Sequence, residues 1–195
     1  MRRNRSVLAL ILVLIPLLAF TQQNDSLNGK LSHYSLSIGT GWTHYFNNRE
    51  YGDKNIITDF GGVSFRFFWE PEYRLSLGLE SGYYKLFNIK GHLTPDISVE
   101  ADRSVIPMLL LVRMRIVNYF HLGTGFGLAL ITNKSSGPSQ QVITKTLSVS
   151  NYQFSASYIY PLNTHLRLGG EMKLYNYGSL NDWMYTLQLL CTIRF

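Results

Sequence analysis

Ten charged side chains recur at alternating positions of apolar-rich segments, where they could line the interior of a β-barrel. They are Arg66, Glu70, Arg74, Glu80, Arg113, Arg115, Arg167, Glu171, Lys173 and Arg194. Two kinds of chemistry fit this set. A basic lining would favour anions in a channel, whereas charges that pair with one another would fill a narrow lumen. We expect pairing, because an eight-stranded barrel barely holds its own side chains and buried charges must be paired.

Histidines and a nearby serine are the residues from which an enzyme site could be built. His33 and Ser35 lie two positions apart and share a strand face, while His121 and His165 lie beside predicted turns. A Ser–His pair works only when the hydroxyl is within hydrogen-bond reach of an oriented imidazole. The sequence carries no motif that we recognise for a lipid A deacylase or palmitoyltransferase. We therefore predict no catalytic residue and no enzyme.

Metal and cofactor chemistry has little support in the sequence. Asp96, Glu100 and Asp102 lie in a predicted loop, but their spacing does not match the Asp-x-Asp-x-Asp-Gly pattern of a calcium loop. Cys191 is the single cysteine, so an intramolecular disulfide is excluded. We predict no metal and no cofactor.

Eight segments must position these side chains, and each alternates apolar with polar residues. They span residues 34–43, 63–70, 73–83, 106–116, 120–130, 151–160, 165–174 and 183–195, the last ending on the aromatic Phe195. In a strand, this period of two gives one apolar face and one polar face. The pattern predicts an all-β fold, an eight-stranded antiparallel up-and-down transmembrane β-barrel.

The connections alternate in length along the chain. Short turns are predicted near 70–72, 117–118 and 161–163, and longer links over 45–59, 85–103, 132–146 and 177–182. Outer-membrane barrels alternate short periplasmic turns with longer external loops, and an even strand number puts both termini in the periplasm. The link 45–59 mixes aromatic with charged residues, which suits an adhesive surface and an interfacial belt equally well.

The outward face of the barrel is decided by residue size and by the aromatics. A soluble, lipocalin-like barrel would turn its apolar face inward around a ligand. Here the apolar face carries large side chains and the opposite face is rich in Gly and Ser. Aromatics gather at both strand ends: Trp69, Tyr73, Phe120, Tyr158, Tyr160 and Phe195 at one, Trp42, Tyr83, Trp183 and Tyr185 at the other. Two such belts favour a barrel embedded in a membrane.

The amino terminus has the layout of a secretory signal peptide. Arg2, Arg3 and Arg5 precede an apolar core from Val7 to Phe20, and we place cleavage before Gln22. The predicted domains are therefore a signal peptide, 1–21, and an outer-membrane barrel domain, 22–195. Without the three arginines the chain has 15 Lys and Arg against 12 Asp and Glu, so no nucleic-acid partner is predicted.

Two stretches resemble a known family. Residues 104–115, followed by a turn and residues 119–128, resemble the Bacteroidota outer-membrane β-barrel family called porin-like or PorT-like, barrels of the OmpA type. The segments around Trp69–Pro71 and Leu75–Tyr83 are similar to it as well. The resemblance implies the eight-stranded architecture. The name-giving member is associated with a secretion machine, but no functional residue carries over.

These observations predict a non-enzymatic integral outer-membrane barrel with a structural or protein-interaction role and external loops as its contact surface. The expected partners are outer-membrane lipid, the barrel-assembly machinery through the C-terminal Phe195, and envelope proteins. Two alternatives stay open: a narrow pore for small solutes, and a lipid-modifying outer-membrane enzyme.

Overall fold

The computed structural model describes residues 32–46, 55–71, 74–94, 97–137, 140–178 and 182–195, without side-chain detail at 55–57 and 90–99. His33–Phe195 form one compact unit, distinct from Met1–Ser32. The predicted signal peptide, Glu72 and Tyr73, Asp96, and parts of the links 45–59 and 177–182 lie outside the described residues.

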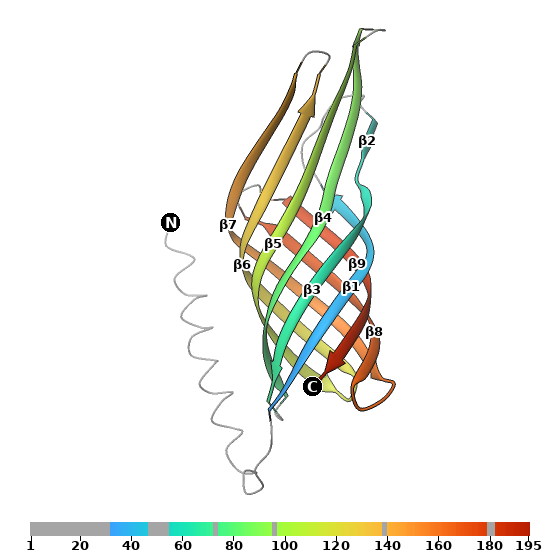
Figure 1. The fold of residues 1–195 in the computed structure, drawn as a ribbon, viewed down its shortest axis with the longest axis vertical. Coiled ribbons are helices and arrows are strands. Elements are labelled where there is room, and N and C mark those ends of the chain that lie inside the picture. The colour runs from blue at the N-terminus through green and yellow to red at the C-terminus, as the bar shows by residue number, and fades with distance from the viewer. Residues whose placement is uncertain (1–31, 47–54, 72–73, 95–96, 138–139, 179–181) are drawn as a thin grey trace, which may run out of the picture. The chain divides into compact units, whose positions relative to one another are not determined.

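Antiparallel strands close into a barrel (Figure 1). The strands are β1 His33–Phe46, β2 Asn55–Ile57, β3 Asp59–Glu70, β4 Leu75–Thr94, β5 Ile97–Val117, β6 Phe120–Ser136, β7 Gln141–Pro161, β8 Leu166–Tyr177 and β9 Asp182–Arg194. β1 pairs with β9 to close the barrel, while the three-residue β2 pairs with β4 beyond the top of β3. The predicted eight-stranded antiparallel barrel is confirmed. Among the described residues, no helix has the length and apolar character needed to cross a membrane.

The two faces of each strand follow the predicted alternation. In β1, Ser35 and Ser37 are buried inside the barrel, whereas Leu36 and Ile38 are exposed on its outer surface. The outer surface carries large apolar side chains on every spanning strand, among them Phe65, Leu79, Leu110, Phe126, Phe154, Met172 and Leu189. A closed barrel with this surface satisfies its backbone internally and presents an apolar band to lipid.

The barrel has two distinct ends. At the turn end lie the short connections at 118–119 and 162–165 and the last residue, Phe195, whose amide donates to the Tyr34 carbonyl at 2.9 Å. The Tyr34 ring stacks on Phe67 and on Phe195, with centroids 5.6 and 6.4 Å away. At the opposite loop end, Trp42 packs edge-on against Tyr185 at 5.9 Å. Aromatic rings therefore gather at both ends, as the sequence predicts.

The predicted links 85–103 and 132–146 are wrong, because most of their residues continue the strands. β4 and β5 run for 20 and 21 residues, β6 for 17 and β7 for 21. Their pairing continues to Thr94↔Ile97 and to Ser136↔Gln141, so these four strands form a sheet that rises beyond the rest of the barrel (Figure 1). We call this part the sheet extension. Both faces of the sheet extension lie outside the lipid band. Its sequence therefore shows no alternation of apolar and polar residues that would predict strands.

Bulges interrupt the register where the extension begins. The β4–β5 register shifts between Lys85 and Phe87, and the β6–β7 register shifts between Gly127 and Ala129. Ser150, on the β7 side of the second shift, has a positive φ of 62°. A bulge bends the strand and reverses the parity of its side chains beyond it, so inward and outward positions cannot be extrapolated from the barrel into the extension.

The buried apolar core lies inside the barrel, and glycines make room for its rings. A Cβ at Gly78 would lie 2.4 Å from a ring carbon of Phe68, and one at Gly62 would lie 2.5 Å from a ring carbon of Tyr84. Inward glycines therefore allow large side chains to cross a lumen of small diameter.

Candidate functional site in the lumen

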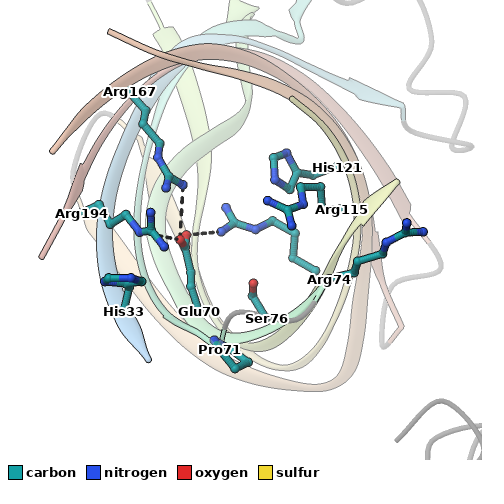
Figure 2. Close-up of a pocket in the computed structure, with 10 residues that line it drawn as sticks. His33, Glu70, Pro71, Arg74, Ser76, Arg115, His121, Arg167 and Arg194 are labelled. Carbon is teal, nitrogen blue, oxygen red and sulfur yellow. Dashed lines mark hydrogen bonds and ion pairs between the residues drawn. The ribbon is translucent and has the colours of Figure 1, made fainter. Parts of the chain in front are cut away.

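The inward-facing charges form two groups, and the first lies at the turn end. Glu70, the last residue of β3, accepts hydrogen bonds from the Ser35 hydroxyl at 2.7 Å and from Arg113 at 2.6 Å. Nitrogens of Arg167 and Arg194 lie 3.3 and 3.7 Å from its other oxygen (Figure 2). One carboxylate thus serves three guanidinium groups that come from β5, β8 and β9.

A cavity of about 360 Å³ opens around this carboxylate. Its charged lining residues are Arg74, Arg113, Arg115, Arg167, Arg194 and Glu70, and we call these six the arginine mouth. Arg74 and Arg115 are exposed, and within the described part of the chain they form no ion pair. Counted over the described residues, the arginine mouth holds five cations and one carboxylate, an excess that the water at the barrel end can solvate.

The second group lies deeper and is balanced. Arg66 and Glu80 are directly opposite each other on β3 and β4, and Glu171 and Lys173 share one face of β8. Arg66 bonds to Glu171 at 2.7 Å and Lys173 bonds to Glu80 at 2.6 Å. The crossed distances are 3.8 Å for Arg66–Glu80 and 3.5 Å for Lys173–Glu171. We call these four residues the charge centre; it contains two cations and two carboxylates.

Neutral polar side chains complete the charge centre. The Tyr175 hydroxyl donates to Glu80, and it lies 3.0 Å from the Tyr84 hydroxyl. Gln153 donates to the second oxygen of Glu80 at 3.1 Å, and Gln188 donates to the Tyr84 hydroxyl at 3.4 Å. All four of these side chains are buried. The lumen is therefore filled by side chains at this depth.

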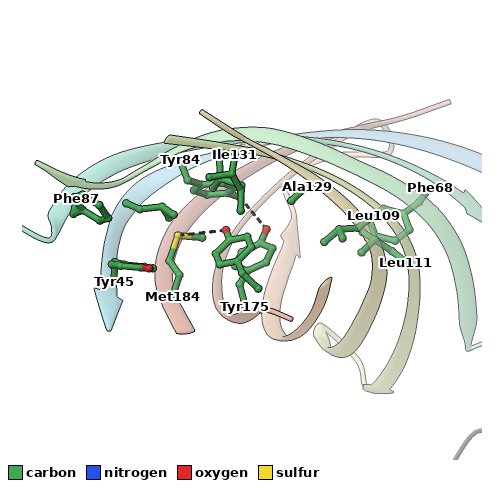
Figure 3. Close-up of a cluster of buried hydrophobic side chains, with 13 residues drawn as sticks. Tyr45, Phe68, Tyr84, Phe87, Leu109, Leu111, Ala129, Ile131, Tyr175 and Met184 are labelled. Carbon is green, nitrogen blue, oxygen red and sulfur yellow. Dashed lines mark hydrogen bonds between the residues drawn. The ribbon is translucent and has the colours of Figure 1, made fainter. Parts of the chain in front are cut away.

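Buried apolar side chains also occupy the lumen and form one cluster (Figure 3). Phe68 and Leu111 both lie opposite Gly78, between the charge centre and the arginine mouth, whereas Leu109 lies opposite Glu80. The Arg113 guanidinium lies 3.9 Å from the centroid of the Phe68 ring. Toward the loop end, Tyr45 and Met184 belong to the same cluster. Phe68 and Leu111 thus form an apolar layer between the two charged groups.

The predicted site residues are thus divided between two environments. Eight of the ten belong to ion pairs, four in the charge centre and four around Glu70. The remaining two, Arg74 and Arg115, line the cavity. They leave an excess of positive charge there that ion pairing does not neutralise. Tyr84, Tyr175, Gln153 and Gln188 were not predicted as part of the network, although their strand parity relative to Glu80 and Lys173 places them on the inward face.

The residues considered for catalysis have other partners. The Ser35 hydroxyl donates to Glu70 and not to His33. A ring nitrogen of His121 lies 3.1 Å from the Tyr119 carbonyl, and a ring nitrogen of His165 lies 3.1 Å from the Arg194 carbonyl. No group of three or more His, Cys, Asp or Glu among the described residues could hold a metal ion.

Comparisons with known proteins concern the fold. No protein-family model matches the sequence, and no curated protein matches it. Among solved structures, Ail, the attachment invasion locus protein of Yersinia pestis, in complex with the heparin analogue sucrose octasulfate, matches at 14% identity with a TM-score of 0.57. The match covers 84% of this chain and 99% of that chain.

Two further outer-membrane proteins are similar. OprG from Pseudomonas aeruginosa matches at 12% identity and a TM-score of 0.51, over 85% of this chain and 97% of that one. A major outer membrane protein from Thermus thermophilus matches at 13% identity and a TM-score of 0.50, over 84% of this chain and 99% of that one. The fold is that of an eight-stranded outer-membrane β-barrel. At these identities the likeness shows the fold alone, and the resemblance to the PorT-like family stays a prediction.

Proposed function

We propose that this chain is a non-enzymatic barrel of the outer membrane that binds another protein along the free edge of its sheet extension. The observation that carries the proposal is the pairing of β7. Residues from Gln141 to Ser148 pair with β6 on one side, whereas pairing with β8 begins only at Tyr152. In the described ranges of the chain, no strand pairs with the other side of Gln141–Leu147.

An open strand edge is a ready surface for association. It presents a row of backbone N–H and C=O groups on which an extended segment of another protein can form an additional strand. Exposed apolar side chains flank this edge: Val142, Ile143, Leu147 and Val149 are each more than half exposed. Proteins usually protect such an edge with charges or prolines, and from Gln141 to Leu147 the edge carries one charge, Lys145.

The length of the strands supports a position of this edge outside the lipid. About 9–11 residues suffice for a tilted strand to cross a bilayer, and β5 and β7 each have 21. The surplus lies at the loop end, where outer-membrane barrels carry their external loops. With this orientation, both ends of the barrel domain and the arginine mouth face the periplasm, and Phe195 lies where the barrel-assembly machinery would engage it.

The pore alternative has less support from the geometry. The side chains of Glu80 and Lys173 are fully buried, and Tyr84 and Tyr175 fill the lumen at the same depth. We expect the purified barrel to give no discrete conductance steps in a planar bilayer. Steps that change when Arg113 is neutralised would favour a narrow pore instead. The enzyme alternative has no paired hydroxyl and imidazole among the described residues considered for it, since Ser35 bonds to Glu70.

A photo-crosslinking experiment tests the proposed contact. A photoreactive residue replaces Ile143 in a tagged chain that is expressed in its native outer membrane, and we expect a discrete protein adduct on illumination. Thr144→Lys places a charge on the free edge and should reduce the adduct strongly. Ser135→Lys is the matched control, because Ser135 is exposed at almost the same height on β6, one strand in from the edge.

The Ser135→Lys control distinguishes pairing along the β7 edge from nonspecific adhesion of the sheet extension. An adduct that persists with Thr144→Lys, or that falls equally with Ser135→Lys, would contradict binding along the β7 edge. Heat-modifiable mobility on a gel verifies that each variant forms the closed barrel. The name of the Yersinia pestis neighbour, an attachment invasion locus protein, supports the proposal only as an example of an interaction role on this fold.

A further inference from the structure

The arginine mouth has more positive charge than its own carboxylate can neutralise. Glu70 already accepts from Ser35 and Arg113, and it lies within ion-pair distance of Arg167 and Arg194. Its oxygens are therefore occupied by side chains of the barrel. Among the described lining residues there is no second carboxylate for Arg74 and Arg115, so an anion from outside can bind them.

Arg74 and Arg115 supply the available donors. The Arg115 amide donates to the Arg74 carbonyl at 2.7 Å, so the two side chains leave from adjoining backbone positions on the β4–β5 side of the cavity. Both are exposed, and neither bonds to a carboxylate among the described residues. A guanidinium group presents its N–H donors as a planar fork that matches two oxygens of a carboxylate or phosphate.

The base of the cavity is fixed in place. Arg113 is buried, held by Glu70 at 2.6 Å and by the Phe68 ring beneath it at 3.9 Å. The Phe68 ring in turn fills the space over Gly78, where a Cβ would clash with it. An anion that enters the mouth would meet cations already held in place, which reduces the entropy cost of binding.

The cavity also restricts what can reach it. It opens at the turn end, inside the strand wall, and its volume of about 360 Å³ exceeds that of one phosphate or tricarboxylate ion. The filled charge centre closes the inner end. A membrane lipid on the outer surface is separated from the arginines by the strands, so the ligand must come from the aqueous side.

We infer that the arginine mouth is a binding site for a soluble, multiply charged oxyanion whose charged groups are phosphates or carboxylates. Arg74 and Arg115 bind its exposed oxygens, and Arg113, Arg167 and Arg194 provide the positive field behind them. A second negative charge on the ligand strengthens every one of these interactions. This inference concerns the turn end and is independent of the proposed contact along β7.

The test uses the full barrel in phosphatidylcholine nanodiscs, titrated calorimetrically with pyrophosphate, with citrate and with acetate. We expect pyrophosphate or citrate to bind and acetate to bind at least about tenfold more weakly, because it carries a single charge. Arg74→Gln and Arg115→Gln should each weaken the bound anion by about tenfold, the loss of one charge-assisted hydrogen-bond pair. Lys145→Gln, which removes an exposed cation from the extension, is the matched control and should change nothing.

Each result has a defined meaning. Selective binding of pyrophosphate identifies a phosphate ligand, and selective binding of citrate identifies a carboxylate ligand. Absence of binding at millimolar concentration overturns the inference, as does an equal loss in Arg115→Gln and Lys145→Gln. Because Arg74 and Arg115 are exposed, their variants should keep the heat-modifiable mobility of the closed barrel. A negative result here leaves the crosslinking test of the β7 edge unaffected.

Discussion

The charge centre and the arginine mouth are built from the same residue types on the same inward face, yet they differ in balance. The charge centre has two cations for two carboxylates, and Glu80 and Lys173 have no exposed side-chain surface. The arginine mouth has five cations for one carboxylate, and the side chain of Arg194 is 30% exposed. Depth in the lumen, not residue type, therefore decides whether charges must neutralise each other.

The physical reason is desolvation. An ion withdrawn from water must recover its hydration energy from partners, and an unpaired buried charge is strongly destabilising. Near the barrel end, water and salt screen the excess of arginines. An unbalanced group of cations is tolerated there, and it keeps donors free for a ligand.

The largest effect is expected when the balance of the charge centre is broken. Glu80→Gln removes the carboxylate that Lys173 and Arg66 share, leaving two buried cations with Glu171 alone. We expect a loss of about 3–5 kcal/mol in the free energy of unfolding. Urea unfolding in lipid vesicles, followed by tryptophan fluorescence, measures it. A loss no larger than that of Glu70→Gln would break the comparison between the two regions.

The next effect concerns the apolar layer between the two regions. Gly78→Ala places a Cβ 2.4 Å from the Phe68 ring and 2.6 Å from the Phe67 carbonyl oxygen. The ring and the adjoining backbone must shift, and the contact of the ring with Arg113 must change. We expect a loss of about 1–3 kcal/mol, typical of an overpacked core, in the same unfolding assay. Gly170→Ala is the control, because a Cβ there would have no atom closer than 3.9 Å. Equal stability of the two variants would show that the apolar layer around Phe68 accommodates the added methyl group without loss of stability.

The sequence predicts the spanning part of the fold well because lipid and lumen impose opposite demands on alternate residues. The β1 strand, expected at 34–43, runs from His33 to Phe46. The same rule fails in the extension, where Thr132–Ser136 is polar on both faces and Val142–Ile143 places two apolar residues side by side. Period-two patterns reveal a strand only where its two faces meet different solvents.

The sequence predicts which charged residues face the lumen, but not which of them pair or at what depth they lie. Parity alone places Arg66, Glu80 and Arg115 on the inward face, as the structure does for the first two by burial and for Arg115 at the cavity. Which cation meets which carboxylate depends on strand register, such as Arg66 opposite Glu80. Depth along the barrel axis depends on where each strand begins. Neither quantity is encoded in the residues of one strand.

A smaller effect is expected when the single carboxylate of the arginine mouth is neutralised. The Glu70 side chain is 9% exposed, and its partners Arg167 and Arg194 can turn toward water when its charge is lost. The oxygen of a Gln side chain can still accept the hydrogen bond of the buried Arg113. For Glu70→Gln we expect a loss of about 1–2 kcal/mol, the scale of hydrogen bonds to a charged group. The same change raises the positive charge around the cavity, so the affinity for the bound oxyanion should rise. A fall in that affinity would indicate that Glu70 positions the arginines for binding.

The smallest effect should come from the ion pair between Lys85 and Asp102 in the sheet extension, 2.7 Å long and about one-third exposed on both sides. Burial alone would raise the pKa of Asp102, but the hydrogen bond from Asn88 and the pairing with Lys85 outweigh it and lower that pKa. A lowered carboxylate pKa stabilises the folded state above the unfolded pKa of about 4, and this contribution disappears as pH falls through the folded value. Exposed pairs of this kind contribute less than about 1 kcal/mol.

The Asp102 contribution can be followed in the extension itself. A carbon-detected NMR titration should give a carboxyl midpoint below that of an unstructured Asp, and amide exchange around Asp102 should accelerate in the same acidic range. Asp102→Asn should remove the pH dependence while leaving the barrel strands protected, since no charge-centre residue contacts this pair. Faster amide exchange at the charge centre as well as in the extension would contradict this expectation. The contribution of a carboxylate to stability would then not depend on its depth in the barrel.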